Sequence, residues 1–159
     1  MRHLIGLISD THGLVRPSVF DALAGVELIL HAGDVGGDGT EVLDELATIA
    51  PVHGVFGNTD PPDAPQLTTS IEREIGGVRV HVSHGHEVGA PTPEKLLARY
   101  SADVIVFGHT HRHLVVRADG RWVVNPGAAG PKRFSLSPSV GRMTVTDGEV
   151  AIEILELPE

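Results

Sequence analysis

Short apolar runs alternate with amphipathic segments through the first half of the chain. The runs at residues 3–9, 27–31 and 52–56 have the length and composition of buried strands. Between them, apolar residues at helical spacing mark one segment that opens at Pro17 and another that follows Thr40. We expect Thr40 to cap the second helix, whose apolar stripe continues to Ala50. Strands that alternate with helices predict a parallel sheet covered by helices.

The second half carries the pattern of antiparallel strands. Runs at 71–75 and 78–83 flank Gly76-Gly77, a two-residue turn typical of a hairpin. A helix is expected to open at Thr92-Pro93, before a wholly apolar strand at 104–107. Two more hairpins should turn at Asp119-Gly120 and Asp147-Gly148, pairing residues 114–117 with 121–125 and 140–146 with 150–157. We therefore predict one α/β domain over residues 1–159, parallel first and antiparallel last.

Composition narrows the possible classes of protein. A chain of 159 residues, 41% of them hydrophobic, fits one ordinary domain with a real core. The sequence has no cysteine, which excludes disulfides, thiolate metal sites and cysteine nucleophiles, and suggests a cytoplasmic location. The apolar run at 4–8 is too short for a signal peptide, and no run is long enough to span a bilayer. We expect neither export nor a membrane partner.

The charge balance argues against nucleic acid as the main partner, because 21 acids face 12 Lys and Arg, for a formal net charge of −9. Ten histidines against one Tyr and one Trp favour metal or proton chemistry over aromatic stacking. A small phosphorylated substrate can still bind such a chain if bound metal ions reverse the local field.

Metal-type ligands occur in five short stretches, four of which follow an apolar run. They are Asp10-Thr11-His12, Gly33-Asp34, Gly57-Asn58, His84-Gly85-His86 and Gly108-His109-Thr110-His111. Ligands of open α/β sheets bind outside the carboxyl ends of the strands, so these stretches should converge. A single Asp or Asn after Gly is usually a turn residue. Together, however, two Asp, one Asn and four His make a sensible site for a pair of metal ions.

Counting charge favours a phosphate ligand at such a site. Two divalent ions, the carboxylates of Asp10 and Asp34, and a bridging hydroxide sum to about +1. Two metals about 3.5 to 4 Å apart can activate the hydroxide and hold the phosphoryl oxygens during an in-line displacement. We expect Asp34 to be the bridging carboxylate, because it lies centrally among the stretches. The ligand set suits Mn, Fe, Ni or Zn, and our prediction is Mn²⁺.

The order of the motifs, DxH, GD, GN, HGH and GHTH, resembles the calcineurin-like metallophosphoesterase superfamily, and specifically its small phosphodiesterase branch, the YfcE-like proteins. The resemblance runs from Ser9 to Gly127. It implies an α/β fold in which two facing mixed sheets are flanked by helices, a four-layer αββα sandwich. It also implies two sets of metal ligands that share Asp34: Asp10, His12, Asp34 and His111 for one ion, and Asp34, Asn58, His84 and His109 for the other.

One position departs from the pattern of the superfamily. Many members have GNH, whose His is thought to assist the leaving group, whereas this chain has Thr59. A threonine is not a proton donor of comparable acidity, and the small branch commonly lacks this His too. The departure moves the expected substrate from monoesters toward small phosphodiesters. The predicted catalytic residues are Asn58 and His86, the latter as a substitute acid or phosphate contact.

Two alternatives stay open at this point. The first is a phosphomonoesterase that uses the same site. The second is a non-catalytic protein-binding scaffold, like the retromer subunit of this fold, which lost ligands would favour; here every ligand position is filled. The sequence does not fix the oligomeric state, and a homo-oligomer is possible.

Several polar residues outside the motifs have more than one interpretation. His31 either orients a ligand or ends a strand. Asp60 is read as a turn former. Lys132 and Arg133 offer phosphate contacts or belong to a solvated loop. The remaining histidines and arginines are interpreted as structural (His3, His53, His81, His113) or as surface charge (Arg79, Arg112, Arg121).

Overall fold

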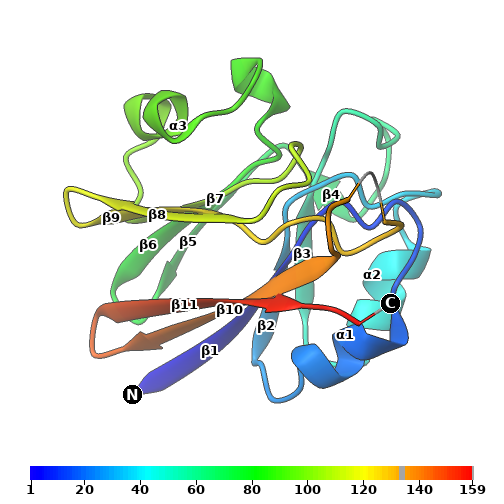
Figure 1. Ribbon diagram of the computed structural model, residues 1–159, viewed down its shortest axis with the longest axis horizontal. Coiled ribbons are helices and arrows are strands. Elements are labelled where there is room, and N and C mark those ends of the chain that lie inside the picture. Colours follow the sequence, from blue (N-terminus) through cyan, green and yellow to red (C-terminus); the bar gives the residue numbers. More distant parts are fainter. Residues whose placement is uncertain (133–134, 159) are drawn as a thin grey trace.

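Two mixed β-sheets face one another at the centre of the molecule (Figure 1). The computed structural model describes residues 1–132 and 135–158. The first sheet has the strand order β11-β10-β1-β2-β3-β4 and the second β5-β6-β7-β9-β8. The strands of the first are β1 (Arg2–Ile8), β2 (Leu28–His31), β3 (Val52–Val55), β4 (Leu67–Thr68), β10 (Ser139–Thr146) and β11 (Glu149–Glu156). Those of the second are β5 (Ile71–Ile75), β6 (Val78–Val82), β7 (Val104–Val106), β8 (Leu114–Ala118) and β9 (Arg121–Asn125).

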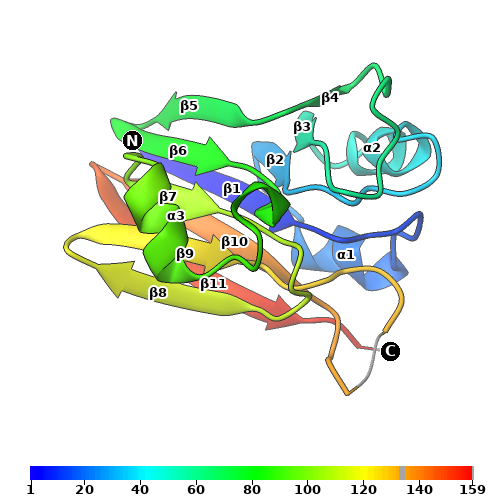
Figure 2. The ribbon, with the colours of Figure 1, turned by 90° about the horizontal axis from the view of Figure 1, so that it is seen from above.

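Helices cover the outer face of each sheet. The helices α1 (Pro17–Ala22) and α2 (Glu41–Leu46) pack on the first sheet, whereas α3 (Pro93–Arg99) lies across the second (Figures 1 and 2). Three hydrophobic clusters fill the spaces between these layers: one between the sheets, one under α1 and α2, and one under α3. The predicted four-layer αββα sandwich is confirmed. Among the described residues, no helix has the length and apolar character needed to span a membrane.

Parallel pairing brings the predicted ligand stretches to one edge of the sandwich. In the first sheet, Ile8 pairs with His31 and His31 with Gly54, so β1, β2 and β3 end together. In the second, Val82 pairs with Val106 and Val106 with Val124, so β6, β7 and β9 end together. Every ligand stretch leaves one of these strands at its carboxyl end, which explains the convergence expected for open sheets.

The structure corrects several local expectations. The second half was expected to be partly antiparallel in the middle and antiparallel last, but β7 lies parallel to both of its neighbours, β6 and β9. The helix α3 makes the crossover between β6 and β7, and β8 lies between β7 and β9 along the chain. The helix α2 ends at Leu46 rather than near Ala50. Thr40 has helical backbone angles and its hydroxyl donates to Asp38 instead of capping α2. The two-residue strand β4 was not predicted, since Leu67–Thr68 is too short to show a period.

Candidate metal centre

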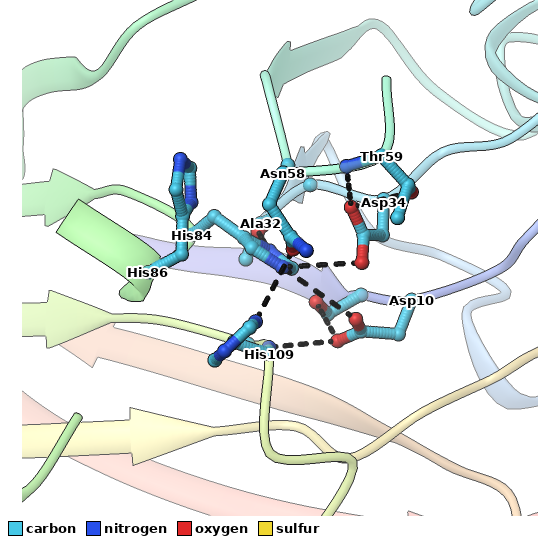
Figure 3. A network of polar contacts seen from close by, with 12 residues as sticks. Asp10, Ala32, Asp34, Asn58, Thr59, His84, His86 and His109 are labelled. Carbon is cyan, nitrogen blue, oxygen red and sulfur yellow. Dashed lines mark hydrogen bonds and ion pairs between the residues drawn. The ribbon is translucent and has the colours of Figure 1, made fainter. Parts of the chain in front are cut away.

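The predicted ligands come together where the strands end, in loops with unusual backbone angles. Figure 3 shows five of them: Asp10, Asp34, Asn58, His84 and His109. Among the predicted ligands, Asp10, His12, Asp34, His109 and His111 all have positive φ, between 46° and 73°. Left-handed backbone costs a non-glycine residue roughly 1–2 kcal/mol, although Asp, Asn and His tolerate it better than most. Strain of this kind clusters at functional sites, where the surrounding structure must enforce it.

Asp10 has one carboxylate oxygen anchored and the other free. Its Oδ2 accepts hydrogen bonds from Ser9 Oγ at 2.6 Å and from the backbone N–H of His109 at 3.2 Å. Its Oδ1 is buried and makes no hydrogen bond to the residues that the structure describes. That oxygen lies 3.4 Å from His111 Nε2 and 3.9 Å from the Nε2 atoms of both His12 and His84. A free carboxylate oxygen surrounded by imidazole nitrogens is the arrangement that a cation would complete.

Asp34, like Asp10, has one carboxylate oxygen held by hydrogen bonds and the other directed toward histidines. Its Oδ1 accepts hydrogen bonds from Thr59, from the backbone N–H at 3.0 Å and from Oγ1 at 2.8 Å. Its Oδ2 faces His84 Nε2 at 3.3 Å and His12 Nε2 at 3.8 Å. Burial opposes ionisation of Asp34, but His84 and the two bonds from Thr59 outweigh it and hold the pKa of this carboxyl well below its usual range. Asp34 therefore presents an ionised oxygen to the centre.

His84 is fixed in the orientation a metal ligand needs. Its Nδ1–H donates to the backbone carbonyl of Ala32 at 2.7 Å, which directs Nε2 toward the two carboxylates. Nε2 is buried and, within the described part of the chain, makes no hydrogen bond, although it lies 3.3 Å from Asp34 Oδ2. Burial lowers the pKa of His84, but the facing Asp34 and Asp10 reverse this and raise it overall. The negative charges of the two carboxylates thus favour the charged form of His84.

These donors fit divalent metal ions. Two groups of candidate ligand atoms, each mutually within 4.8 Å, are formed by Asp10, His12 and His111 and by Asp10, Asp34 and His84. Carboxylate and imidazole ligands of this kind suit first-row divalent metals. The two groups share Asp10, whereas Asp34 was expected to be the carboxylate that bridges the two metal ions. Which carboxylate bridges stays a prediction, since oxygens of both face the same histidines.

Asn58 and His109 lie at the outer side of this cluster. Asn58 Oδ1 accepts a hydrogen bond from His109 Nδ1 at 3.2 Å, and the rings of His109 and His84 meet edge to face at 5.2 Å. His86 is more peripheral, with its ring centre 5.4 Å from that of His84 and 6.3 Å from that of His109 (Figure 3). The structure therefore brings all seven predicted ligands together and leaves His86 at their rim. Lys132 lies near His111 across a narrow gap, and Arg133 is outside the described residues.

Two buried side chains tie the ligand loops together. His31 accepts a hydrogen bond from the Gly33 N–H at 3.1 Å through Nδ1, and its Nε2 lies 3.0 Å from Thr11 Oγ1. The carboxylate of Asp60 accepts from the N–H groups of Val35, Gly36 and Gly57. His31 thus joins the Asp10 loop to the Asp34 loop, and Asp60 joins the Asp34 loop to the Asn58 loop. The ligand-orienting interpretation of His31 is favoured, and Asp60 does far more than form a turn.

Sequence reasoning missed one support of the site, Thr59, and did not foresee the contacts of two other residues. Thr59, treated only as a lost histidine, holds Asp34. Asn125 donates to the Gly108 carbonyl and to Thr110 Oγ1, which fixes the loop that carries His109. Arg121, interpreted as surface charge, donates to carbonyls at the end of α3. None of these contacts has a signal within the local sequence, because each partner is distant along the chain or belongs to the backbone.

The fold and the cluster of Asp and His side chains are those typical of a metal-dependent phosphoesterase. The chain belongs to the calcineurin-like phosphoesterase superfamily, whose sequence profile matches residues 3–148. It is 37% identical to a probable metallophosphoesterase of Methanothermobacter thermautotrophicus over 96% of this chain and 91% of that protein. It is also 26% identical to a phosphodiesterase of Methanocaldococcus jannaschii, over 77% and 82% of the two chains.

Solved structures with the same fold include an archaeal phosphodiesterase, 25% identical with a TM-score of 0.73 over 96% of this chain and 99% of that chain. Vps29 of Entamoeba histolytica, crystallised with Zn²⁺, is 27% identical with a TM-score of 0.75 over 96% and 98%. Membership of the small branch that contains such archaeal proteins agrees with the resemblance seen in the motifs.

Proposed function

We propose that this protein is a phosphodiesterase that uses two divalent metal ions, Mn²⁺ by preference, to hydrolyse a small phosphodiester. The observation that supports this most directly is the matched pair of carboxylates. Asp10 and Asp34 each have one oxygen held by hydrogen bonds and the other turned toward the same imidazoles. Phosphodiesterases among the relatives support the choice of substrate class.

Each residue of the site has a role in this proposal. Asp10, His12, Asp34 and His111 would hold one ion, and Asp34, Asn58, His84 and His109 the other. The two ions, when bound, would supply a nucleophile at neutral pH and neutralise charge on the phosphoryl oxygens. The anchored oxygens keep the free ones in place, so that ligand geometry does not depend on the ions alone.

The contacts of Thr59 and His86 bear on the preference for diesters. Thr59 donates its hydroxyl proton to Asp34, so it stabilises a ligand rather than protonating a leaving group. His86 is an imidazole at the rim, with its ring centre 5.4 Å from that of His84 and 6.3 Å from that of His109, and it lies outside the ligand groups. We assign His86 as the acid or phosphate contact. The site suits leaving groups that need modest help, which favours diesters over alkyl monoesters.

The test removes metal with a chelator, restores single metals, and follows a chromogenic diester and the matching monoester. We expect two metals per chain and diester cleavage that is restored best by Mn²⁺. Replacement of Asp34 by Asn should lower both metal content and the rate by at least about 100-fold, since it removes the charge shared by the ligand set. The matched control is Asp44→Asn, an exposed acid on α2.

Two other outcomes would contradict the phosphodiesterase proposal. If the metal-loaded protein cleaved neither ester, and Asp34→Asn changed nothing, the enzyme hypothesis would be wrong and a protein-binding scaffold would be favoured. Faster cleavage of the monoester would establish the phosphomonoesterase alternative. A cytoplasmic location and a small substrate complete the proposal, supported by the absence of cysteine and by the acidic charge.

A further inference from the structure

A hollow beside the candidate metal centre lies between two segments distant in sequence. It is bounded by His111, Arg112 and His113 on one side and by residues 135–137 on the other, with Glu156 of β11 closing it. His111 belongs to both places, because its Nε2 also lies 3.4 Å from Asp10 Oδ1. A substrate held at the metal centre would therefore have this hollow directly next to its phosphate.

The size of the hollow matches one arm of a small diester. Its volume is about 380 Å³, within the range of sites that take small molecules. A larger hollow of about 400 Å³ lies elsewhere, among the hairpin turns at residues 77, 120 and 148, and contains none of the predicted ligands. Only a diester has a second organic group that needs such a place, so the hollow bears on substrate choice.

The lining offers a cation that the fold does not use. Arg112 is exposed, and among the described residues its guanidinium has no hydrogen-bond, ion-pair or stacking partner; only its backbone N–H is bonded, to Thr110 Oγ1. Six other arginines are occupied: Arg16, Arg79, Arg121 and Arg142 donate to carbonyls, and Arg99 and Arg117 lie over aromatic rings. Arg2 and Arg73, like Arg112, have no such side-chain partner among the described residues. Arg112 differs from Arg2 and Arg73 in its place, because it lines the hollow that contains His111, whereas the hollows lined by Arg2 and Arg73 contain none of the predicted ligands.

The other polar groups of the hollow leave Arg112 available for an anion. Glu156, the acid in the lining, lies 3.9 Å from His113 Nε2 rather than against Arg112. Ser135 and Ser137 add hydroxyl groups that can donate. In a chain of net charge −9, Arg112 brings a positive charge to the hollow beside the predicted metal ligand His111. Arginine binds carboxylate and phosphate groups through two parallel hydrogen bonds.

Resting on the proposed function, we propose that this hollow receives one ester arm of the substrate and that Arg112 selects an arm ending in a carboxylate or phosphate. Arg112 is then a specificity residue and takes no part in the bond cleavage. The natural substrate would be a small phosphodiester with a second negative charge on one arm.

The experiment compares two p-nitrophenyl phosphodiesters that differ only at the end of the second arm, one made from glycolate and one from ethylene glycol. The metal-loaded protein should prefer the carboxylate arm, and the preference in kcat/KM should fall about 10-fold in Arg112→Ala, mainly through KM. Arg112→Lys should keep part of it, and high salt should weaken it. A third probe with a terminal phosphate compares the two anions.

The control is Arg117→Ala on β8, which lines the other hollow and should leave the preference unchanged. Cleavage of the neutral-arm probe together with equal preferences in wild type and Arg112→Ala would overturn the inference and leave the phosphodiesterase proposal intact. Failure to cleave any of the three probes with any metal would overturn both.

Discussion

The two ends of the sandwich both place non-glycine residues in left-handed backbone, but they do so for different reasons. At the hairpin end, Asp119 and Asp147 have φ of 53° and 51° and each precedes a glycine in a tight turn (Figure 2). At the metal end, the residues with positive φ are five of the predicted ligands. Among the described residues, no other non-glycine position has positive φ.

The difference shows where each conformation is specified. An Asp-Gly pair adopts a hairpin turn from local preference alone. The ligand loops instead depend on neighbours: the N–H groups of Asp10, His12 and Gly13 donate to the carbonyls of Gly33, Asp34 and Val35, which extends the pairing of β1 and β2 beyond the strands. Backbone strain at the metal end is therefore held by tertiary contacts, and at the hairpin end it needs none.

The largest expected effect comes from adding one methyl group at each end. In Gly36→Ala, the new Cβ would lie 2.0 Å from the backbone nitrogen of Gly13, at a φ of +97°. In Gly148→Ala, the φ is +81° but nothing lies within 4 Å. We expect Gly36→Ala to reduce the free energy of unfolding by about 3–5 kcal/mol and Gly148→Ala by about 1 kcal/mol, measured by urea denaturation of the metal-free proteins. Equal losses would show that the loops are not locked together.

Much of the fold could be predicted because its signals are local. Apolar runs gave the positions of the long strands, and the Gly76-Gly77, Asp119-Gly120 and Asp147-Gly148 turns lie where expected, with positive φ at both residues of each pair. The ligand stretches could be found because each is short and follows a strand. Their order along the chain then carried the family resemblance, which supplied the two-sheet arrangement that periodicity cannot give.

The supports of the site could not be predicted in the same way. Asp60 binds three N–H groups, two of them on a loop 24 and 25 residues earlier in the chain. Such pairings depend on how parallel strands are set side by side, and hydrophobic pattern does not encode them. The parallel placement of β7 against β9 was missed for the same reason, since the segments before and after β7 in the chain, 71–83 and 114–125, were predicted as hairpins.

The second expected effect is smaller and concerns how His31, at the metal end, makes the stability of the protein depend on pH. Burial lowers the pKa of His31 to about 4 from its ordinary 6.5, although the nearby Asp10 and Asp60 act in the opposite direction. Between these values the unfolded chain binds a proton that the folded protein does not, so stability falls as the pH falls from about 7 to 4. The shift corresponds to about 3 kcal/mol.

In His31→Asn, the amide oxygen can still accept from the Gly33 N–H, but the titration is gone. The loss of unfolding free energy between pH 7 and 4 should therefore be about 3 kcal/mol smaller than in the wild type, by urea denaturation of metal-free protein. An unchanged loss would contradict a buried neutral histidine.

Metal affinity should also fall about 10- to 100-fold in His31→Asn, as when other supports of metal ligands are removed. Thr11→Val, which removes the contact with His31 and the hydrogen bond that Thr11 Oγ1 donates to the Val35 carbonyl, should show at least a similar loss of affinity, and the double variant little more than Thr11→Val alone.

The smallest effect tests the strain itself, through the order of two substitutions at one position. At an extended residue such as His53 on β3, alanine should be more stable than glycine by about 0.5–1 kcal/mol, because glycine loses more entropy on folding. At His109, with φ of 73°, the order should reverse and glycine should be more stable than alanine by about 1 kcal/mol, because it relieves the left-handed backbone. At each position, both the alanine and the glycine variant lack the imidazole. The effect of losing that side chain therefore cancels when the two variants are compared. If alanine were more stable than glycine at both positions, the backbone at His109 would have to relax when its side chain is removed. The His109 side chain, rather than the loops around it, would then maintain the left-handed backbone.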